Sequence, residues 1–200
     1  MRPVSWSRSV VSMAGLVEEA RAIAERLMSV ELPRRWRHVQ AVARTAGEAS
    51  SAVEPTDRDP LVAAAWLHDI GYVRGLVDTG FHPLDGARWL RRHEFDPRVT
   101  ALVANHSCAL IEADERGLAD VLAAEFANES TATTDALWYS DMTTGPDGQP
   151  FEVTERLDEI DQRYGPDHVV TRFIRRARPE IVGAVRRTEQ RLARARTASA

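Results

Sequence analysis

The sequence contains no lysine, so all 26 of its basic residues are arginines, and it contains one cysteine. The missing lysine excludes Schiff-base and lysine-nucleophile chemistry. The lone Cys108 excludes an intramolecular disulfide and a cysteine-rich zinc site. No apolar run approaches the roughly 20 residues that a membrane helix needs. Serines interrupt the short apolar pieces of residues 1–17, so no secretory signal is indicated. We therefore expect a cytoplasmic protein without membrane contacts.

The charges are unevenly distributed along 200 residues of ordinary globular composition, 44% hydrophobic and 28% charged. Residues 165–200 hold nine arginines against three acids, a balance of +6, whereas residues 1–164 hold 17 arginines against 27 acids, a balance of −10. A basic helical tail could contact nucleic acid. A solvated face that also pairs with the acidic body is the favoured alternative, so we expect no nucleic-acid partner.

Helical periodicity dominates the chain. Apolar residues recur at helical spacing, and prolines, glycines and polar clusters separate the segments. The predicted helices are 16–28, 33–50, 60–70, 83–92, 97–106, 118–126, 135–141, 154–164, 167–177 and a last one that begins at Pro179. The segment 60–70 is apolar nearly all round and should form the buried centre. Because convincing alternating strands are absent, we predict an all-α bundle within one domain.

His68 and Asp69 adjoin each other at the end of this most apolar helix. A buried histidine and aspartate are costly unless something satisfies both. A divalent metal does so, and imidazole with carboxylate suits Mn, Fe, Co, Ni or Zn. The alternative for this pair alone is a polar end to the helix, since a histidine near a helix C-terminus is ordinary. Two further residues favour the metal: His38 lies on a helix whose apolar stripe faces the core, and Asp141 ends the apolar segment ALWYS.

The order of His38, then His68 and Asp69 in LHDIG, then Asp141 in WYSDM resembles the HD-domain superfamily of metal-dependent phosphohydrolases. The resemblance spans about residues 34–148. It implies an all-α HD-domain bundle, to which residues 1–33 add an N-terminal helix and residues 149–200 add C-terminal helices. It also implies that these four residues hold a divalent metal at the centre of the bundle.

Two more histidines resemble a subset of that superfamily with two metals. His82 in FHPLDGARWL and His106 in LVANHS match the additional histidines of the series H…HD…H…H…D. By this resemblance His38, His68, Asp69 and Asp141 hold the first metal. Asp69, which would bridge the ions, holds the second with the two additional histidines. The alternatives are a loop histidine for His82 and a helix-capping residue for His106, so one or two ions per chain are expected.

Phosphoryl chemistry requires cationic partners near the metal. Arg35 lies three residues before His38, on the same helical face, and R-x-x-H resembles the opening of the family branch that splits symmetrical dinucleoside tetraphosphates. The alternative is a surface arginine. Arg35 and Asp69 are therefore the expected catalytic residues, acting on a small phosphorylated substrate, with nucleotides among the candidates. Further candidates for substrate contacts are Arg74, Asp85 and Thr144.

Two other functions stay open at this stage. Several related phosphohydrolases carry a lysine after HD-I-G or HD-I-A, where this chain has Tyr72, so their substrates do not transfer directly. A group of HD proteins uses the same six ligands to hold two irons and oxidises organophosphonates or inositol. The lysine-containing segment of those oxygenases is absent here. A non-catalytic nucleotide-binding or interaction module is the third hypothesis, and the intact set of expected ligands argues against it. The oligomeric state is left open.

Overall fold

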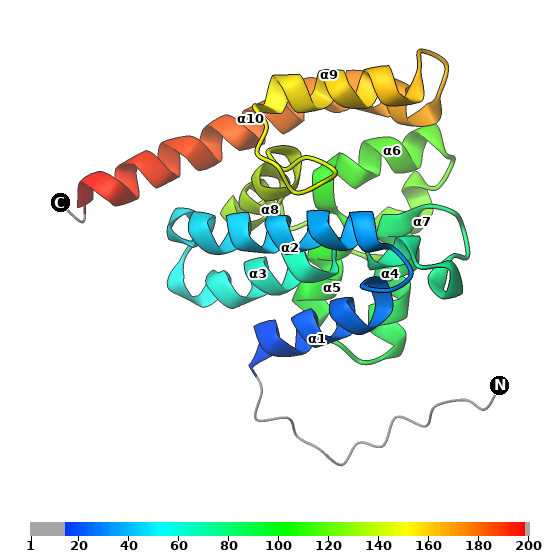
Figure 1. Cartoon of the computed structure of the whole chain (residues 1–200), viewed down its shortest axis with the longest axis horizontal. Coiled ribbons are helices and arrows are strands. Elements are labelled where there is room, and N and C mark those ends of the chain that lie inside the picture. Colours follow the sequence, from blue (N-terminus) through cyan, green and yellow to red (C-terminus); the bar gives the residue numbers. More distant parts are fainter. Residues whose placement is uncertain (1–14, 199–200) are drawn as a thin grey trace.

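The computed structural model describes residues 15–198, and these fold into α-helices with short 3-10 turns and no strand (Figure 1). An isolated β-bridge joins Thr144 and Pro150. The helices are α1 (Leu16–Met28), α2 (Pro33–Glu48), α3 (Arg58–Leu67), α4 (His82–Arg92), α5 (Pro97–Ala104), α6 (Ala109–Glu115), α7 (Ala119–Glu125), α8 (Ala132–Met142), α9 (Val153–Tyr164) and α10 (Val169–Ala198). The predicted all-α class is confirmed; the expected N-terminal element 1–33 lies outside the described residues over positions 1–14. In the described part of the chain, no helix combines the length and apolarity that crossing a membrane requires.

Helix α3 forms the centre of the bundle, as its all-round apolar sequence predicts. It packs against α1, α2, α5 and α8, and Leu61, Ala64 and Leu67 are fully buried. Small alanines along α3 allow the surrounding helices to approach closely. The C-terminal end of α3 therefore reaches the interior, where His68 and Asp69 follow it. This packing brings two polar residues into the middle of the protein.

Helices α9 and α10 form a second layer, which lies across the top of Figure 1. The sequence predicted two helices separated before Pro179, and that prediction is wrong because α10 is one helix of 30 residues with Pro179 inside it. A proline removes one helical hydrogen bond. The buried stripe of α10 continues on both sides of it, through Phe173, Ala177, Ile181 and Ala184, against α6 and α8. Packing along the whole stripe thus outweighs the local cost.

Two 3-10 turns, Ile70–Tyr72 and Arg74–Leu76, follow the end of α3. Gly71 lies in the turn Ile70–Tyr72, which packs against the start of α4. A Cβ atom at Gly71 would lie 2.0 Å from the carbonyl oxygen of His82 and 2.8 Å from the amide nitrogen of Gly86. Only glycine permits this approach, so the Gly of LHDIG fixes the position of α4 relative to His68 and Asp69.

Candidate metal centre

Six polar side chains from five segments meet in the interior of the bundle. His38 comes from α2, the adjacent His68 and Asp69 follow α3, and His82 begins α4. His106 lies in the 3-10 turn His106–Cys108, and Asp141 lies in the last turn of α8. All are buried except His82, whose side chain is 14% exposed. We call these six residues the floor: His38, His68, Asp69, His82, His106 and Asp141.

The first group in the floor is His38, His68 and Asp141, whose ligand atoms lie within 4.8 Å of one another. His38 Nε2 lies 3.1 Å from Asp141 Oδ1, and His68 Nε2 lies 3.8 Å from the same oxygen. His68 Nδ1 donates to the carbonyl oxygen of Ala65 at 2.8 Å, which leaves Nε2 facing the centre. His68 Nε2 is buried and has no hydrogen-bond partner among the described residues. A divalent cation would satisfy this orphaned atom.

The second group is Asp69, His82 and His106, again with ligand atoms within 4.8 Å. His106 Nδ1 donates to the carbonyl oxygen of Val103 at 2.6 Å, so its Nε2 also faces the group. The Nε2 atoms of His82 and His106 lie 3.0 Å apart. Two ligands about 2.1 Å from one ion and at a right angle are separated by about 3 Å. The donor set and spacing of this group therefore fit a metal ion.

Asp69 lies between the two groups. Its Oδ2 atom is 3.5 Å from His68 Nε2, and its Oδ1 atom is 3.4 Å from His82 Nε2. The Arg35 guanidinium donates to Oδ2 at 2.5 Å. Burial alone would raise the pKa of Asp69, but Arg35 and the surrounding imidazoles hold this pKa well below its usual range. The carboxylate is thus charged, and each oxygen faces a different group.

The pKa of His38 in the first group is shifted in the opposite direction to the pKa values of His82 and His106 in the second. Burial lowers the pKa of His38, but the hydrogen bond and charge of Asp141 outweigh it, so the net pKa is raised. Burial lowers the pKa of His82 well below its usual value and also lowers the pKa of His106. Neutral imidazole is the form that coordinates a metal. The second group is therefore held in the ligating form.

Ser107 belongs to this site, although the sequence did not single it out. Its hydroxyl donates to Asp141 Oδ2 at 2.5 Å. Ser107 and Cys108 both adopt left-handed backbone conformations, with φ of 49° and 61°. Such conformations are costly for residues other than glycine and persist where the surroundings enforce them. The only signal in the sequence was the position of Ser107 directly after His106.

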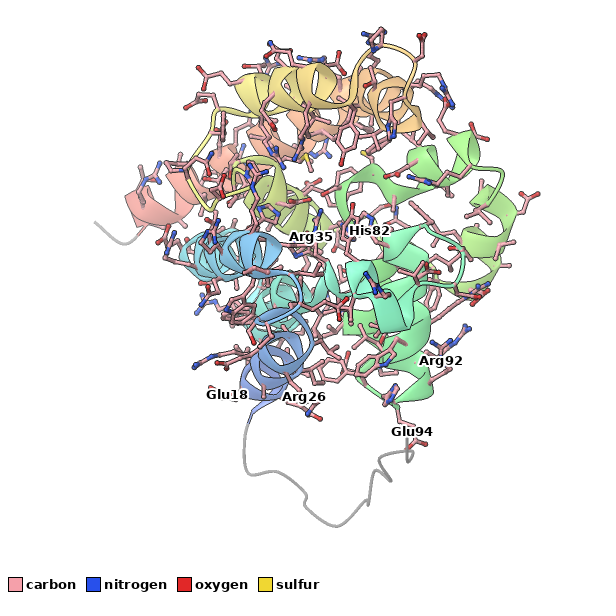
Figure 2. The ribbon with its side chains drawn as sticks, turned by 45° about the vertical axis from the view of Figure 1, so that its right-hand side comes forward. Glu18, Arg26, Arg35, His82, Arg92 and Glu94 are labelled. Atoms are coloured by element: carbon pink, nitrogen blue, oxygen red, sulfur yellow. The ribbon has the colours of Figure 1, made fainter. Side chains whose placement is uncertain are left out.

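Arg35, Tyr72 and His82 form a stack beside the floor. The guanidinium carbon of Arg35 lies 3.5 Å from the centre of the Tyr72 ring. That ring stacks on the His82 imidazole, with 4.0 Å between centres and 19° between planes. Figure 2 labels Arg35 and His82 near the middle of the molecule, below the layer of α9 and α10. Tyr72 thus supports both an expected ligand and the expected phosphate-binding arginine.

A cavity of about 450 Å³ extends from the floor toward α9 and α10. We call these two helices the roof. Arg35, Tyr72 and Ser107 line the floor side, and Arg156 and Phe173 line the roof side. A volume in this range is typical of a small-molecule site. The roof residues were not among the predicted site residues, because no motif connects them to the histidines.

Three predicted substrate contacts do not line this cavity. Arg74 is exposed, and its backbone N–H donates to Glu31. Asp85 is buried and accepts hydrogen bonds from the backbone N–H groups of residues 78–80. Thr144 is buried, and its hydroxyl donates to the carbonyl oxygen of Ser140. The structure thus places Asp85 in the first turn of α4, where it bonds the preceding loop, Thr144 in the turn after α8, and Arg74 on the surface. Arg35, by contrast, both lines the cavity and contacts Asp69.

A comparison with protein-family models covers the segment that contains this site. The family model described as HD domain matches residues 35–142, more than half of the chain. The tRNA (cytidine(56)-2'-O)-methyltransferase of Picrophilus torridus is 34% identical over 79 residues. These residues cover 40% of this chain and 22% of that relative's length. No solved structure matches the chain. All six floor residues lie within the segment that the family model covers.

Proposed function

We propose that this chain, which belongs to the HD-domain family, is a metal-dependent phosphohydrolase that cleaves a phosphate ester or a nucleotide. The observation that carries the proposal is the position of Asp69. Its two carboxylate oxygens face two separate groups of buried ligands, and the Arg35 that contacts it lines a cavity large enough for an organic phosphate. A fixed carboxylate, neutral imidazoles and a guanidinium in one cavity suit phosphoryl transfer to water.

The residues of the floor divide between two ions. His38, His68 and Asp141 would hold one divalent transition metal, and His82 with His106 would hold a second, with Asp69 shared by both. Mn, Fe, Co, Ni and Zn all fit nitrogen and carboxylate ligands. When bound, such ions polarise a phosphoryl oxygen and lower the pKa of a water molecule toward neutrality.

The chain's own groups then orient the substrate. The Arg35 guanidinium, held over Tyr72, directs N–H donors to the phosphoryl oxygens from the side of Asp69. Ser107 donates to Asp141 and so fixes which carboxylate oxygen faces the imidazoles. The carbonyl oxygens of Ala65 and Val103 hold the Nδ1 protons of His68 and His106. Every floor side chain is thus oriented before the substrate binds.

Phosphate release from a panel of nucleotides and phosphomonoesters tests this function. The protein is freed of metal, supplied with each candidate metal in turn, and compared with Asp69→Asn and with Asp59→Asn, a control on the exposed face of α3. We expect hydrolysis by the wild type and the control. Asp69→Asn should lose at least about 1,000-fold, because both ions lose a ligand. Equal activity in Asp69→Asn and the wild type would contradict the proposal.

The same experiment separates the two alternative functions. Consumption of O2 with an organophosphonate by the iron-loaded protein, without phosphate release from any ester, would identify a di-iron oxygenase. Failure to bind any of the metals would instead identify a non-catalytic binding module. Both outcomes would overturn the hydrolase, since hydrolysis requires bound metal and a phosphate ester as substrate.

A further inference from the structure

The roof of the cavity contains a buried cation that hydrolysis at the floor does not use. Arg156 lies on α9, outside the segment 35–142 that matches the family model. Its side chain is 7% exposed and lines the cavity. Its Nε atom is buried and has no hydrogen-bond partner among the described residues. A buried guanidinium with an unmet donor is costly, so its retention requires a reason.

Arg156 shares a carboxylate with a second arginine. Arg156 Nη1 donates to Glu159, and Arg163 Nε lies 3.3 Å from the other oxygen of the same carboxylate. Two cations therefore share one acid. The nearby Glu112, which also lines the cavity, is paired with Arg116 at 2.6 Å. The Nε donor of Arg156 thus remains unmet among the described residues, and an anion in the cavity would satisfy it.

Part of the cavity wall is apolar. Ile160, Phe173 and Ile174 line it on the roof side, and Met142 lines it nearer the floor. A phosphoryl group contains no apolar surface to cover these side chains. A substrate that covers this part of the wall therefore needs an apolar body.

We propose that the roof forms a second anion-binding subsite, in which Arg156 binds a negatively charged group at the end of the substrate remote from the floor. The substrate class is accordingly an organic phosphate with an apolar body and a second anionic group, either a carboxylate or a further phosphate. This inference rests on the proposed function for the placement of the hydrolysed phosphate at the floor. To the proposed function it adds Arg156 as the residue that selects among phosphate esters.

Ligands that cannot be hydrolysed test the subsite directly. Straight-chain alkyl phosphonates with two to six methylenes, each ending in a methyl, a carboxylate or a second phosphonate, are titrated calorimetrically into the full chain, with and without Mn2+. When the alkyl chain is long enough to span the cavity, the ligand with a terminal anion should bind at least about 10-fold more tightly than the methyl-ended ligand of the same length. The carboxylate and phosphonate series distinguish the two kinds of anion.

Three variants show whether Arg156 causes this gain. In Arg156→Gln the preference for a terminal anion should fall to about one, and Arg156→Lys should restore part of it. Glu159→Gln removes the carboxylate that competes with the ligand for Arg156, so it should increase the preference for a terminal anion. Misfolding cannot produce such a gain. Arg178→Gln is the matched control, because Arg178 lies in the roof, pairs with Asp158 and does not line the cavity; it should keep the wild-type preference.

The outcomes separate this inference from the hydrolase proposal. A terminal anion that gives no gain at any length, or a gain that persists in Arg156→Gln, would overturn the subsite. If the subsite fails in this way but the protein releases phosphate from esters, the hydrolase proposal holds without the subsite. A gain that depends on Arg156 in a protein that hydrolyses no ester would retain the subsite and overturn the hydrolase.

Discussion

The floor and the roof of the cavity are held together by different interactions. In the floor, the polar side chains other than His82 are buried, and they bond to one another, to backbone carbonyls or to Arg35, as in His38 with Asp141 and Gly145. In the roof, α10 is held by a buried apolar stripe and by arginines at its surface. Arg172 and Arg176 pair with Glu115 at 3.0 and 2.6 Å.

This difference indicates that the floor and the roof serve different purposes. A buried polar network keeps a single arrangement, because each broken bond leaves an unsatisfied group. Exposed ion pairs contribute little, typically below about 1 kcal/mol each, so the apolar stripe of α10 carries most of the attachment of the roof. The floor is thus suited to fixed chemistry, and the roof, which lies outside the matched family segment, is suited to choosing the substrate.

Removal of metal should have the largest effect and should act on the floor. We expect a chelator to reduce phosphate release to background, a loss of at least about 1,000-fold. The melting temperature should also fall, because a ligand held at 1,000 times its Kd stabilises by about 4 kcal/mol. Far-UV circular dichroism should stay unchanged, since the helices pack through apolar residues. Full activity in protein shown to lack metal would refute this.

Gly71→Ala should damage the half of the floor that contains His82. The new Cβ would lie 2.0 Å from the His82 carbonyl oxygen, so α4 must move. We expect a loss of about 1–3 kcal/mol in the free energy of unfolding and a lower metal content, measured by denaturation and elemental analysis. Gly75→Ala is the control, because its Cβ would meet nothing within 4 Å. Identical behaviour of the two variants would show that the approach of Gly71 to α4 does not position the ligands.

Arg35→Gln should weaken substrate binding at the boundary between floor and roof. The guanidinium lines the cavity beside Asp69, and a charge-assisted hydrogen bond contributes about tenfold or more in affinity. We expect KM for phosphate esters to rise about 10-fold, while metal content is kept. Arg37→Gln serves as the control, since Arg37 is exposed and pairs with Asp147. An unchanged KM would remove Arg35 from the substrate site.

The smallest effect is expected on the pH dependence of stability, through the ion pairs that Glu115 makes with the roof. Hydrogen bonds from Arg176 and Arg172 lower the pKa of Glu115 below its usual value. Because the folded-state pKa is the lower one, the stabilisation is present above the unfolded pKa, about 4.5, and is lost as the pH falls through the folded value. Melting temperatures of the wild type and Glu115→Gln should therefore differ slightly at pH 6 and converge as the pH falls through the lowered pKa of Glu115. A difference that grows as the pH falls would contradict this assignment.

Most helices follow from local patterns, and the exceptions have physical causes. The predicted 16–28 helix is α1, and Pro33 and Pro97 begin α2 and α5 as expected for prolines at a helix start. Helix α6 was not predicted, because it starts after the left-handed Ser107 and Cys108, neither of which is a glycine. The break expected at Pro179 is absent because the packing of α10 on α6 and α8 is a tertiary effect.

The floor was predictable in outline and the roof was not. The ordered histidines and aspartates indicated a metal site through their resemblance to HD domains, and the structure brings all six together. Arg156 joins the cavity only because α9 folds back over the floor, a long-range contact that no spacing in the sequence reveals. Asp85 shows the reverse case, since a carboxylate three residues after His82 proved to bond a backbone turn instead.

The central claim is that Asp69 is shared by two metal ions. Elemental analysis of protein purified under limited air, and then reconstituted with each candidate metal, tests it most directly. We predict two ions per chain in the wild type, one in His82→Ala or His106→Ala, and fewer than one in Asp69→Asn. A wild type that binds one ion or none even after reconstitution, or an unchanged count in Asp69→Asn, would contradict this claim.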